Sequence, residues 1–468
     1  MLGRNPSEPS LFQMVDLESL VPANHQLRKI DAVLDLGFVR ETVAECYSAN
    51  RGRPSIDPEL AVRMMLLGVL YNLSDRELCE EIQMHAGMRW FCRLNFHDPV
   101  PDHSTLSRLR GERWAESGLF DRLMDEVVRQ CSGVGLVSGR HLSVDGTEVE
   151  ANASVTSLTR RGPQGEDDVN SSTHEEEDQR EPKPAGEWKG RGERYSNETH
   201  FSPTDPDARL YRKSNQRGAR LSYLVHDLID TKSRVILRRR ASLATGRAER
   251  ETALEMVDEV LESCTELGLP NRPEALTGDT AYGATELITE LIARGIDPHV
   301  PLLAGEALEE VPTWKRRTFN LERRRARDRK VKEAEARNRV REVHRTRGYA
   351  VSRKLRIRSE HLFAEAKNQH GLRRARRRGR KRVEDQAVLC AAVQNLKRLA
   401  SFLGRRDRGA AAASAVAPLR PLIAPIHARF RRFLAHLRVS ITRFGLSACS
   451  SRGRNQPSLQ LQTVPTAP

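Results

Sequence analysis

The chain has 468 residues, of which 38% are hydrophobic and 30% are charged, and its formal net charge is +15. This length allows two or three domains with a sizeable core. Seven scattered cysteines without a C-x-x-C pair argue against a zinc finger or a disulfide framework. No apolar run reaches the length of a membrane span and no signal-peptide core is present, so we expect a cytoplasmic protein.

The first segment, residues 1–125, is predicted to be a helical domain. Asp57 and Pro58 supply an N-cap and an N1 proline before an apolar series. Ser74 and Glu77 have the spacing of a capping box, and a third helix is expected to start at Ser104 or Thr105. Three short capped helices are typical of a helix-turn-helix-like module, and equally of a helical bundle that packs on the next domain.

An α/β domain is predicted over residues 138–403. Asp145 interrupts an alternating apolar series and therefore lies on a half-buried strand, where its carboxylate is held rigidly. Residues at about 156–206 are rich in Gly, Pro, Ser, Asn and charge, and we predict a disordered insertion there. A hairpin of two strands at 220–229 and 233–237 then resumes the sheet, followed by a helix at 248–267.

Asp279 has the setting of a ligand at the end of a strand. It follows a short apolar segment at 275–278 and precedes a helix predicted over 284–294. Ligands of open sheets collect at the carboxyl ends of strands. A further strand is predicted at 297–303.

Positive charge is concentrated in residues 311–400, which hold 30 Lys and Arg against 9 Asp and Glu, a net charge of +21. The remaining chain is therefore net acidic. Such a field favours a nucleic-acid partner and predicts steeply salt-dependent binding. Its densest run, 373–382, is equally compatible with a solvated basic loop. Because few aromatic residues interleave with it, phosphate tracking is expected rather than base stacking.

Within this basic region, residues 314–345 are predicted as a helix or an insertion, and the choice stays open. A helix is predicted over 352–370. On it Arg356, Glu360 and Lys367 fall on one face.

Asp145, Asp279 and Glu360 together have the chemistry of a metal site. Carboxylate oxygens are hard ligands that suit Mg²⁺ or Mn²⁺, and two such ions can support an in-line phosphoryl displacement. The chain holds 63 Asp and Glu residues, however, so any one of them is by itself best explained as a solvated carboxylate. For Glu360 the ordinary explanation is an ion pair with Arg356 on an exposed helix.

The spacing of Arg356, Glu360 and Lys367 matches the Arg-Glu-Lys part of a Tyr-Arg-Glu-Lys signature, and through it the chain resembles bacterial insertion-sequence transposases of the DDE type. The signature's Tyr position falls on Arg353, with Tyr349 one turn earlier. Similarity also covers DPDARLYRKSNQRGARLSYLVHDLID, TGRAERETALEM, DPHV and AVQNLKRL, and RGRPSIDPELAVRMMLLGVLYNLSDREL upstream. Together these segments cover roughly residues 10–403.

This resemblance implies a ribonuclease-H-like catalytic domain behind an all-helical N-terminal domain that could bind DNA ends. It implies that Asp145, Asp279 and Glu360 are catalytic metal ligands for Mg²⁺ or Mn²⁺, with Glu365 the less suitable third acid. By the same resemblance Arg356 and Lys367 would contact DNA phosphates or the terminal bases near the cut. The density of positive charge adds five expected phosphate contacts: Arg373, Arg374, Arg376, Arg377 and Arg378.

The implied partner is double-stranded DNA, both the element ends and the target, held by a homodimer in the nucleoid. No G-x-x-x-x-G-K-[ST] motif occurs, so no nucleotide cofactor is expected. Residues 404–468 are predicted to be a basic, low-complexity tail outside the family core.

Two alternatives remain open at this point. One is a two-metal nuclease that cuts DNA without joining it. The other is a catalytically decayed DNA-binding protein that acts as a repressor or an architectural factor. The intact Asp145, Asp279 and Glu360 argue against that second alternative, whereas the departure at Arg353 and the unusual tail leave room for it.

Overall fold

The computed structural model describes residues 16–48, 55–161, 195–212, 218–302, 305, 307–314 and 319–416, with side chains as far as residue 406. The chain divides into two compact units, Met1–Leu403 and Gly404–Pro468. Of the second unit, only the end of helix α14 is described, so most of the predicted tail lies outside the described residues. Within these ranges no helix is long and apolar enough to cross a membrane.

The N-terminal region is helical, as predicted. Asp57 caps α4 by accepting a hydrogen bond from the Glu59 amide, and both bonds of the Ser74–Glu77 capping box are present at α5. The third start is corrected: Asp102, rather than Ser104 or Thr105, caps α7. The elements are α1 Leu17–Leu20, α2 Gln26–Asp31, α3 Val39–Val43, η1 Ala44–Cys46, α4 Pro58–Leu70, α5 Asp75–Met84, α6 Ala86–Phe91, α7 His103–Arg108, η2 Leu109–Arg113 and α8 Leu119–Gly133.

These helices pack directly on the segment that follows α13 (Ile357–Gln369). The His370 Nδ1 atom lies 3.0 Å from the Val69 carbonyl oxygen. Arg376 donates to the Leu73 carbonyl at 2.5 Å and to the Asn72 side chain at 2.8 Å. This is the contact expected of a helical bundle that packs on the following domain.

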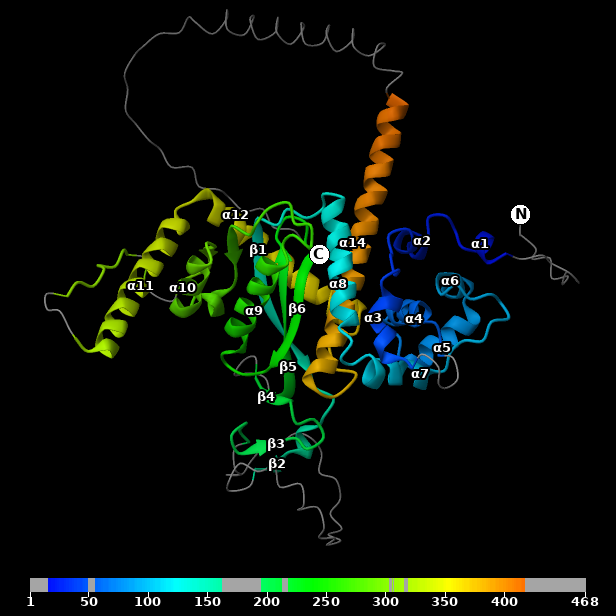
Figure 1. Cartoon of the computed structure of the whole chain (residues 1–468), viewed down its shortest axis with the longest axis horizontal. Coiled ribbons are helices and arrows are strands. Elements are labelled where there is room, and N and C mark those ends of the chain that lie inside the picture. Colours follow the sequence, from blue (N-terminus) through cyan, green and yellow to red (C-terminus); the bar gives the residue numbers. More distant parts are fainter. Residues whose placement is uncertain are drawn as a thin grey trace, which may run out of the picture. The chain divides into compact units, whose positions relative to one another are not determined.

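A mixed sheet forms the centre of the second region (Figure 1). Its order is β4-β5-β1-β7-β8. β4 pairs with residues 220–222 of β5, and β6 pairs with residues 223–229 of the same strand. β1 is antiparallel to β5 and parallel to β7, and β7 is parallel to β8. The strands are β1 His141–Glu150, β4 Arg209–Tyr211, β5 Arg220–Asp230, β6 Ile236–Leu243, β7 Ala275–Thr277 and β8 Asp297–His299.

Helices follow the strands, giving the mixed α/β architecture that was predicted. They are α9 Ala248–Glu262, α10 Thr285–Ala293, α11 Leu321–His344, α12 Arg347–Leu355, α13 Ile357–Gln369 and α14 Arg380–Val416. The stretch 314–345, left open above, therefore contains a 24-residue helix, α11. The single helix predicted over 352–370 is corrected to two, α12 and α13, which meet at Arg356.

The insertion at 156–206 is ordered at both ends, which corrects the prediction of disorder there. A 3₁₀ helix spans Val155–Ser157, and β2 (Thr159–Arg160) pairs antiparallel with β3 (His200–Phe201). Two contacts hold these ends. Phe201 is buried beneath the Arg161 guanidinium, and the Tyr223 hydroxyl donates to Asp205 at 2.6 Å. Residues 162–194 lie outside the described part of the chain.

The edge strand β6 is covered by α14. Asn395 accepts a hydrogen bond from the Ile236 amide at 3.0 Å, and Glu384 accepts one from the Ala241 amide at 3.0 Å. Side chains on a neighbouring helix thus satisfy backbone groups that would otherwise invite pairing with another strand.

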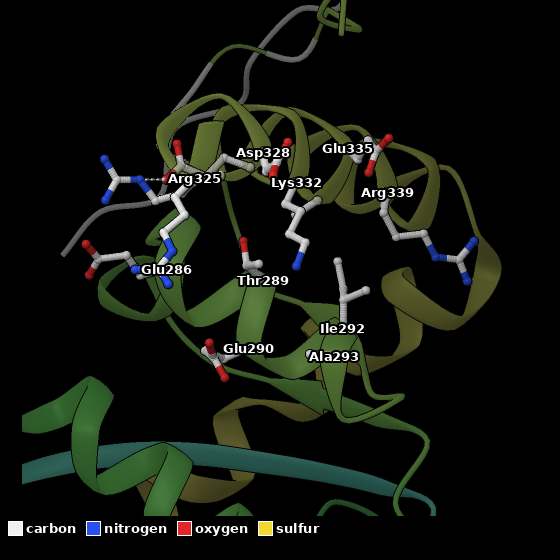
Figure 2. A pocket seen from close by; sticks show the side chains of 13 residues that line it. Glu286, Thr289, Glu290, Ile292, Ala293, Arg325, Asp328, Lys332, Glu335 and Arg339 are labelled. Atoms are coloured by element: carbon white, nitrogen blue, oxygen red, sulfur yellow. Dashed lines mark ion pairs between the residues drawn. The ribbon is translucent and has the colours of Figure 1, made fainter. Parts of the chain in front are cut away.

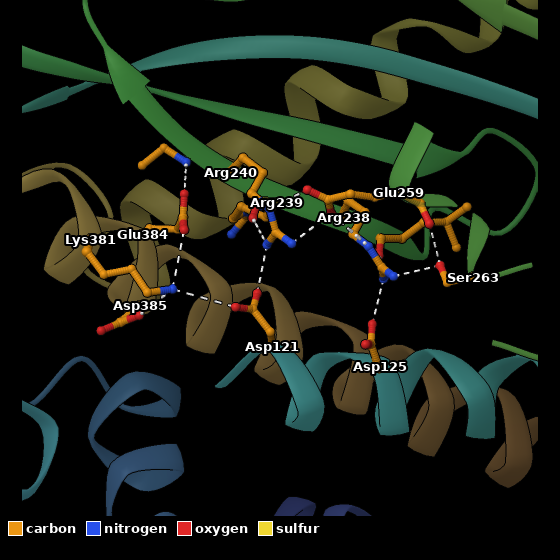
Figure 3. Close-up of polar contacts among 12 residues, drawn as sticks. Asp121, Asp125, Arg238, Arg239, Arg240, Glu259, Ser263, Lys381, Glu384 and Asp385 are labelled. Atoms are coloured by element: carbon orange, nitrogen blue, oxygen red, sulfur yellow. Dashed lines mark hydrogen bonds and ion pairs between the residues drawn. The ribbon is translucent and has the colours of Figure 1, made fainter. Parts of the chain in front are cut away.

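Three consecutive arginines on β6 connect the sheet to its surrounding helices (Figure 3). Arg238 pairs with Asp125 of α8 at 2.6 Å, and Arg240 pairs with Asp121 of α8 at 2.7 Å. Arg239 points to the opposite face, as alternation along a strand requires. There it donates to the Ala387 carbonyl and to Gln394 of α14. This network ties the last helix of the N-terminal region to the sheet.

Candidate functional site

Asp145 and Asp279 occupy matching positions relative to two neighbouring parallel strands, β1 and β7. Ser143 of β1 lies opposite Thr277 of β7, and each aspartate follows two residues later. Asp279 then caps a short 3₁₀ helix, where it accepts a hydrogen bond from the Ala281 amide at 2.8 Å. Burial, together with the nearby charge of Asp279, raises the pKa of Asp145 to about 6. The structure therefore brings these two acids together.

Ser359 orients the Asp145 carboxylate, a role that the sequence analysis missed. Its hydroxyl donates to Asp145 Oδ2 at 2.9 Å, while the Gly146 amide donates to Oδ1 at 2.9 Å. Ser359 lies on α13 directly before Glu360. The one sequence feature that could have pointed to this role is that Ser359 directly precedes the candidate acid Glu360. A lone serine on a helix is too common, however, to be singled out on that basis.

A glycine at position 146 leaves space for a side chain on the opposite strand, β5. A Cβ atom at this position would lie 3.1 Å from His226 Nδ1, and Gly146 and His226 are directly opposite each other on β1 and β5. A larger residue would force the buried imidazole to move. The glycine after Asp145 thus leaves room for the buried His226 ring on the opposite strand.

Glu360 is more exposed than the two aspartates. Its side chain is 52% exposed and lies 3.4 Å from Arg356 Nη2. Arg356 also lines a cavity with Asp279. Within the described ranges, no three His, Cys, Asp or Glu side chains gather closely enough to hold a metal ion. The structure therefore does not gather Glu360 with Asp145 and Asp279 into one ligand cluster, and Arg356 is the residue that both pairs with Glu360 and lines the Asp279 cavity.

The cavity beside Asp279 has a volume of about 270 Å³. From α12, Tyr349 and Arg353 both line it, one helical turn apart. The Tyr349 ring stacks on His344 with ring centres 4.2 Å apart. His299 also lines the cavity, with its Nδ1 atom 2.7 Å from the Ser352 hydroxyl. The tyrosine one turn before the departure at Arg353 therefore faces the same space as Asp279.

Glu365 points away from this site. Its carboxylate pairs with Lys397 at 2.6 Å and with Arg398 at 2.7 Å, both on α14. Burial opposes ionisation, but the hydrogen bond to His370 and the charges of Arg398 and Lys397 keep the pKa of Glu365 well below its usual range. Its role in this structure is to hold α13 against α14.

Four of the predicted phosphate-binding residues line one groove of about 470 Å³: Lys367, Arg373, Arg374 and Arg376. Asn72 of the N-terminal region completes its wall. Lys367 Nζ donates to the Glu148 carbonyl at 2.6 Å, which places this ammonium beside the strand that carries Asp145.

The basic run is a structured segment, which differs from a freely solvated loop. Arg373 donates to Asn368 at 2.7 Å, and Arg378 donates to the Asn152 carbonyl at 3.3 Å. Arg376 is partly committed to the N-terminal helices. Arg377 packs near Gly111 of η2, where burial and the charge of Arg110 lower its pKa to about 10. Arg373, Arg374 and Arg378 remain exposed.

His226 leads to a prediction about pH. It is fully buried, its Nε2 atom lies 2.7 Å from the Ser242 hydroxyl, and burial lowers its pKa to about 4. Between pH 6.5 and 4 the unfolded chain therefore binds a proton that the folded chain excludes. Stability due to the neutral imidazole is present above pH 6.5 and is lost on acidification, by about 3 kcal/mol.

We expect the stability advantage of the wild type over His226→Gln, measured by urea unfolding, to shrink by this amount between about pH 7 and about pH 4. Measuring the difference between the two proteins cancels the titration of Asp145, which has the opposite sign. A difference that does not change with pH would contradict the burial of a neutral His226.

Comparison with known families assigns both regions. The family model described as Transposase domain (DUF772) matches residues 15–112. The model described as Transposase DDE domain matches residues 139–396, more than half of the chain, and spans all three candidate acids. No curated protein and no solved structure matches the chain.

Proposed function

Because the chain belongs to the transposase DDE domain family, we propose that it catalyses metal-dependent cleavage and strand transfer at the inverted-repeat ends of an insertion sequence. Membership makes it a DNA transposase of the polynucleotidyl-transferase type, and DDE domains depend on divalent metal ions. The observation that carries the finer proposal is the register-matched pair Asp145 and Asp279, with Glu360 on the helix whose Ser359 bonds to Asp145.

The proposed ligands of the metal ion are Asp145, Asp279 and Glu360. Their chemistry fits Mg²⁺, because all three offer hard carboxylate oxygens. The electrostatics of the acid pair also fit, since the charge of Asp279 adds to the raised pKa of Asp145 and a cation would relieve this repulsion. When bound, Mg²⁺ supplies charge neutralisation at the phosphate and activates the attacking hydroxyl.

The remaining residues have positioning roles in this proposal. Ser359 and the Gly146 amide orient Asp145 through its two oxygens. Arg356 lies between Glu360 and the Asp279 cavity, where its guanidinium can bind a phosphate oxygen as Glu360 turns toward the acids. Tyr349 and Arg353 border the same cavity and would contact the DNA strand near the cut.

We further propose that the catalytic domain is ribonuclease-H-like. Support comes from its first strand, β1, which carries an acid between an antiparallel and a parallel neighbour. A second acid follows β7, and the third lies on a late helix. A homodimer in the nucleoid is proposed because two element ends must be held together for joining.

The test is Mg²⁺-dependent cleavage and joining of a duplex that carries the element's terminal repeat. Asp279→Ala and Glu360→Ala are expected to abolish both products while DNA binding persists. Glu342→Ala is the matched control for Glu360→Ala, since Glu342 is an exposed helical glutamate that lies 3.6 Å from an arginine, Arg339. Cleavage without joining of a pre-cut end would favour the nuclease alternative. Binding without any chemistry would favour the decayed DNA-binding protein.

A further inference from the structure

Helix α11 leads from the candidate site to a strongly basic end. At its C-terminal end, Arg341, His344 and Arg345 line a pocket of about 630 Å³. Tyr349 and Arg353 line this pocket and also the cavity of Asp279. The helix has 24 residues and is therefore about 36 Å long, close to one turn of B-form DNA.

The arginines in the C-terminal half of α11 are neutralised within the protein. Arg337 pairs with Glu309 at 2.8 Å, and Arg341 pairs with the same carboxylate at 2.7 Å. Arg339 pairs with Asp297 at 2.9 Å. These residues have a structural role, since they hold the helix against β8 and the segment before α11.

The N-terminal half of α11 differs. Arg323, Arg324 and Lys330 are exposed, and no ion pair joins them to another described residue. The neighbouring Arg329, in contrast, lies 3.6 Å from Glu333. Arg323, Arg327 and Lys330 share one face of the helix. Arg327 lies over the ring of Trp314, with 4.8 Å between the guanidinium carbon and the ring centre. Arg325 and Lys332 belong to another face, which borders the groove of about 950 Å³ between α10 and α11 (Figure 2).

The location of this charge is unfavourable for the helix itself. Arg323 and Arg324 occupy the first turn, where the helix dipole repels cations at a cost of about 0.3–1 kcal/mol each. Mutual repulsion among neighbouring arginines adds to that cost. Fold stability therefore gives no reason for Arg323 and Arg324, whereas an external polyanion would stabilise both.

We propose that the outward face at the N-terminal half of α11, formed by Arg323, Arg324, Arg327 and Lys330, binds phosphates of duplex DNA. These phosphates would lie about one turn of B-form DNA from the phosphate that the proposed catalytic site at Asp279 would hold. The proposal rests on the transposase function above and adds a second contact region to it. DNA that lies along α11 would meet the site at one end of the helix and this basic face at the other.

The test measures binding of fluorescent duplexes of arbitrary sequence, of about 10 and about 30 base pairs, over a range of KCl concentrations. For the wild type, the longer duplex should bind more tightly, because it extends past both regions, whereas the shorter duplex is about one turn long and only just spans the distance between them. In the triple variant Arg323→Gln, Arg324→Gln, Lys330→Gln, affinity for the longer duplex should fall about ten- to a hundredfold. The slope of log K against log salt should drop by about 2–3.

A matched control is the double variant Arg122→Gln, Arg129→Gln on α8. Both arginines are exposed, but they pair with Glu41 and Glu126. This variant should retain the wild-type affinity and salt slope. Thermal unfolding of the triple variant should be unchanged or raised, because cations leave a helix N-terminus.

Unchanged affinity and salt slope in the triple variant, with a wild type that binds DNA, would overturn the proposal and leave the proposed function intact. A shift in oligomeric state on sedimentation, without a change in DNA binding, would assign this face to a second copy of the chain and would also overturn it. A wild type that binds neither duplex would instead overturn the transposase function.

Discussion

Asp145→Asn is expected to stabilise the metal-free protein while it abolishes strand transfer. The pKa of Asp145 is raised from 3.8 to about 6, so the folded state favours the protonated carboxyl. The associated stability is present below pH 3.8 and is lost as the pH rises through 6. At about pH 8 the ionised carboxylate therefore costs about 2–3 kcal/mol, which the neutral amide avoids.

We expect urea unfolding without divalent metal to show a gain of about 2 kcal/mol for Asp145→Asn at about pH 8 and little gain at about pH 4. Loss of a metal-binding carboxylate should lower the joining rate at least about a thousandfold. Mg²⁺ should stabilise the wild type and not the variant.

Asp258→Asn is the control for this experiment. The hydrogen bond and charge of Arg294 lower the pKa of the Asp258 carboxyl, so loss of its charge should give no gain at about pH 8. An Asp145→Asn protein with the wild-type joining rate would rule out Asp145 as a ligand. Equal destabilisation at both pH values would contradict the electrostatic account.

Arg239→Met is expected to cause the largest loss of stability, about 3–5 kcal/mol. Arg239 and Asp227 lie opposite each other on β6 and β5, and both side chains are fully buried. Their two hydrogen bonds measure 2.5 and 2.6 Å. Removal of the guanidinium would leave the Asp227 carboxylate buried without its partner. Urea unfolding measures the loss.

Two further variants test that reason. Adding Asp227→Leu to Arg239→Met should restore most of the stability, because no charge is then buried. Arg294→Met should cost no more than about 1 kcal/mol. Arg294 also forms two bonds to one carboxylate, that of Asp258, but these side chains are 24% and 42% exposed. Equal losses for Arg239→Met and Arg294→Met would contradict the role of burial.

Two helix starts were predictable from the sequence, because the hydrogen bonds that fix them join residues close together in the chain. The cap at Asp57 and the capping box of Ser74 and Glu77 depend on hydrogen bonds between residues two or three positions apart. Disorder at the ends of the insertion was predicted wrongly, because composition does not reveal that Phe201 becomes buried or that Asp205 meets Tyr223. Both contacts join segments that are separated in the sequence.

The sequence by itself determined the candidate acids, the concentration of basic residues and the main strands and helices around the acids, because spacing, charge and periodicity are properties of short segments. Only the tertiary structure decided which groups meet. It set the β1–β7 register that aligns Asp145 with Asp279, brought Ser359 onto Asp145, and turned Arg376 toward the N-terminal helices. These contacts join residues more than a hundred positions apart, so no local pattern encodes them.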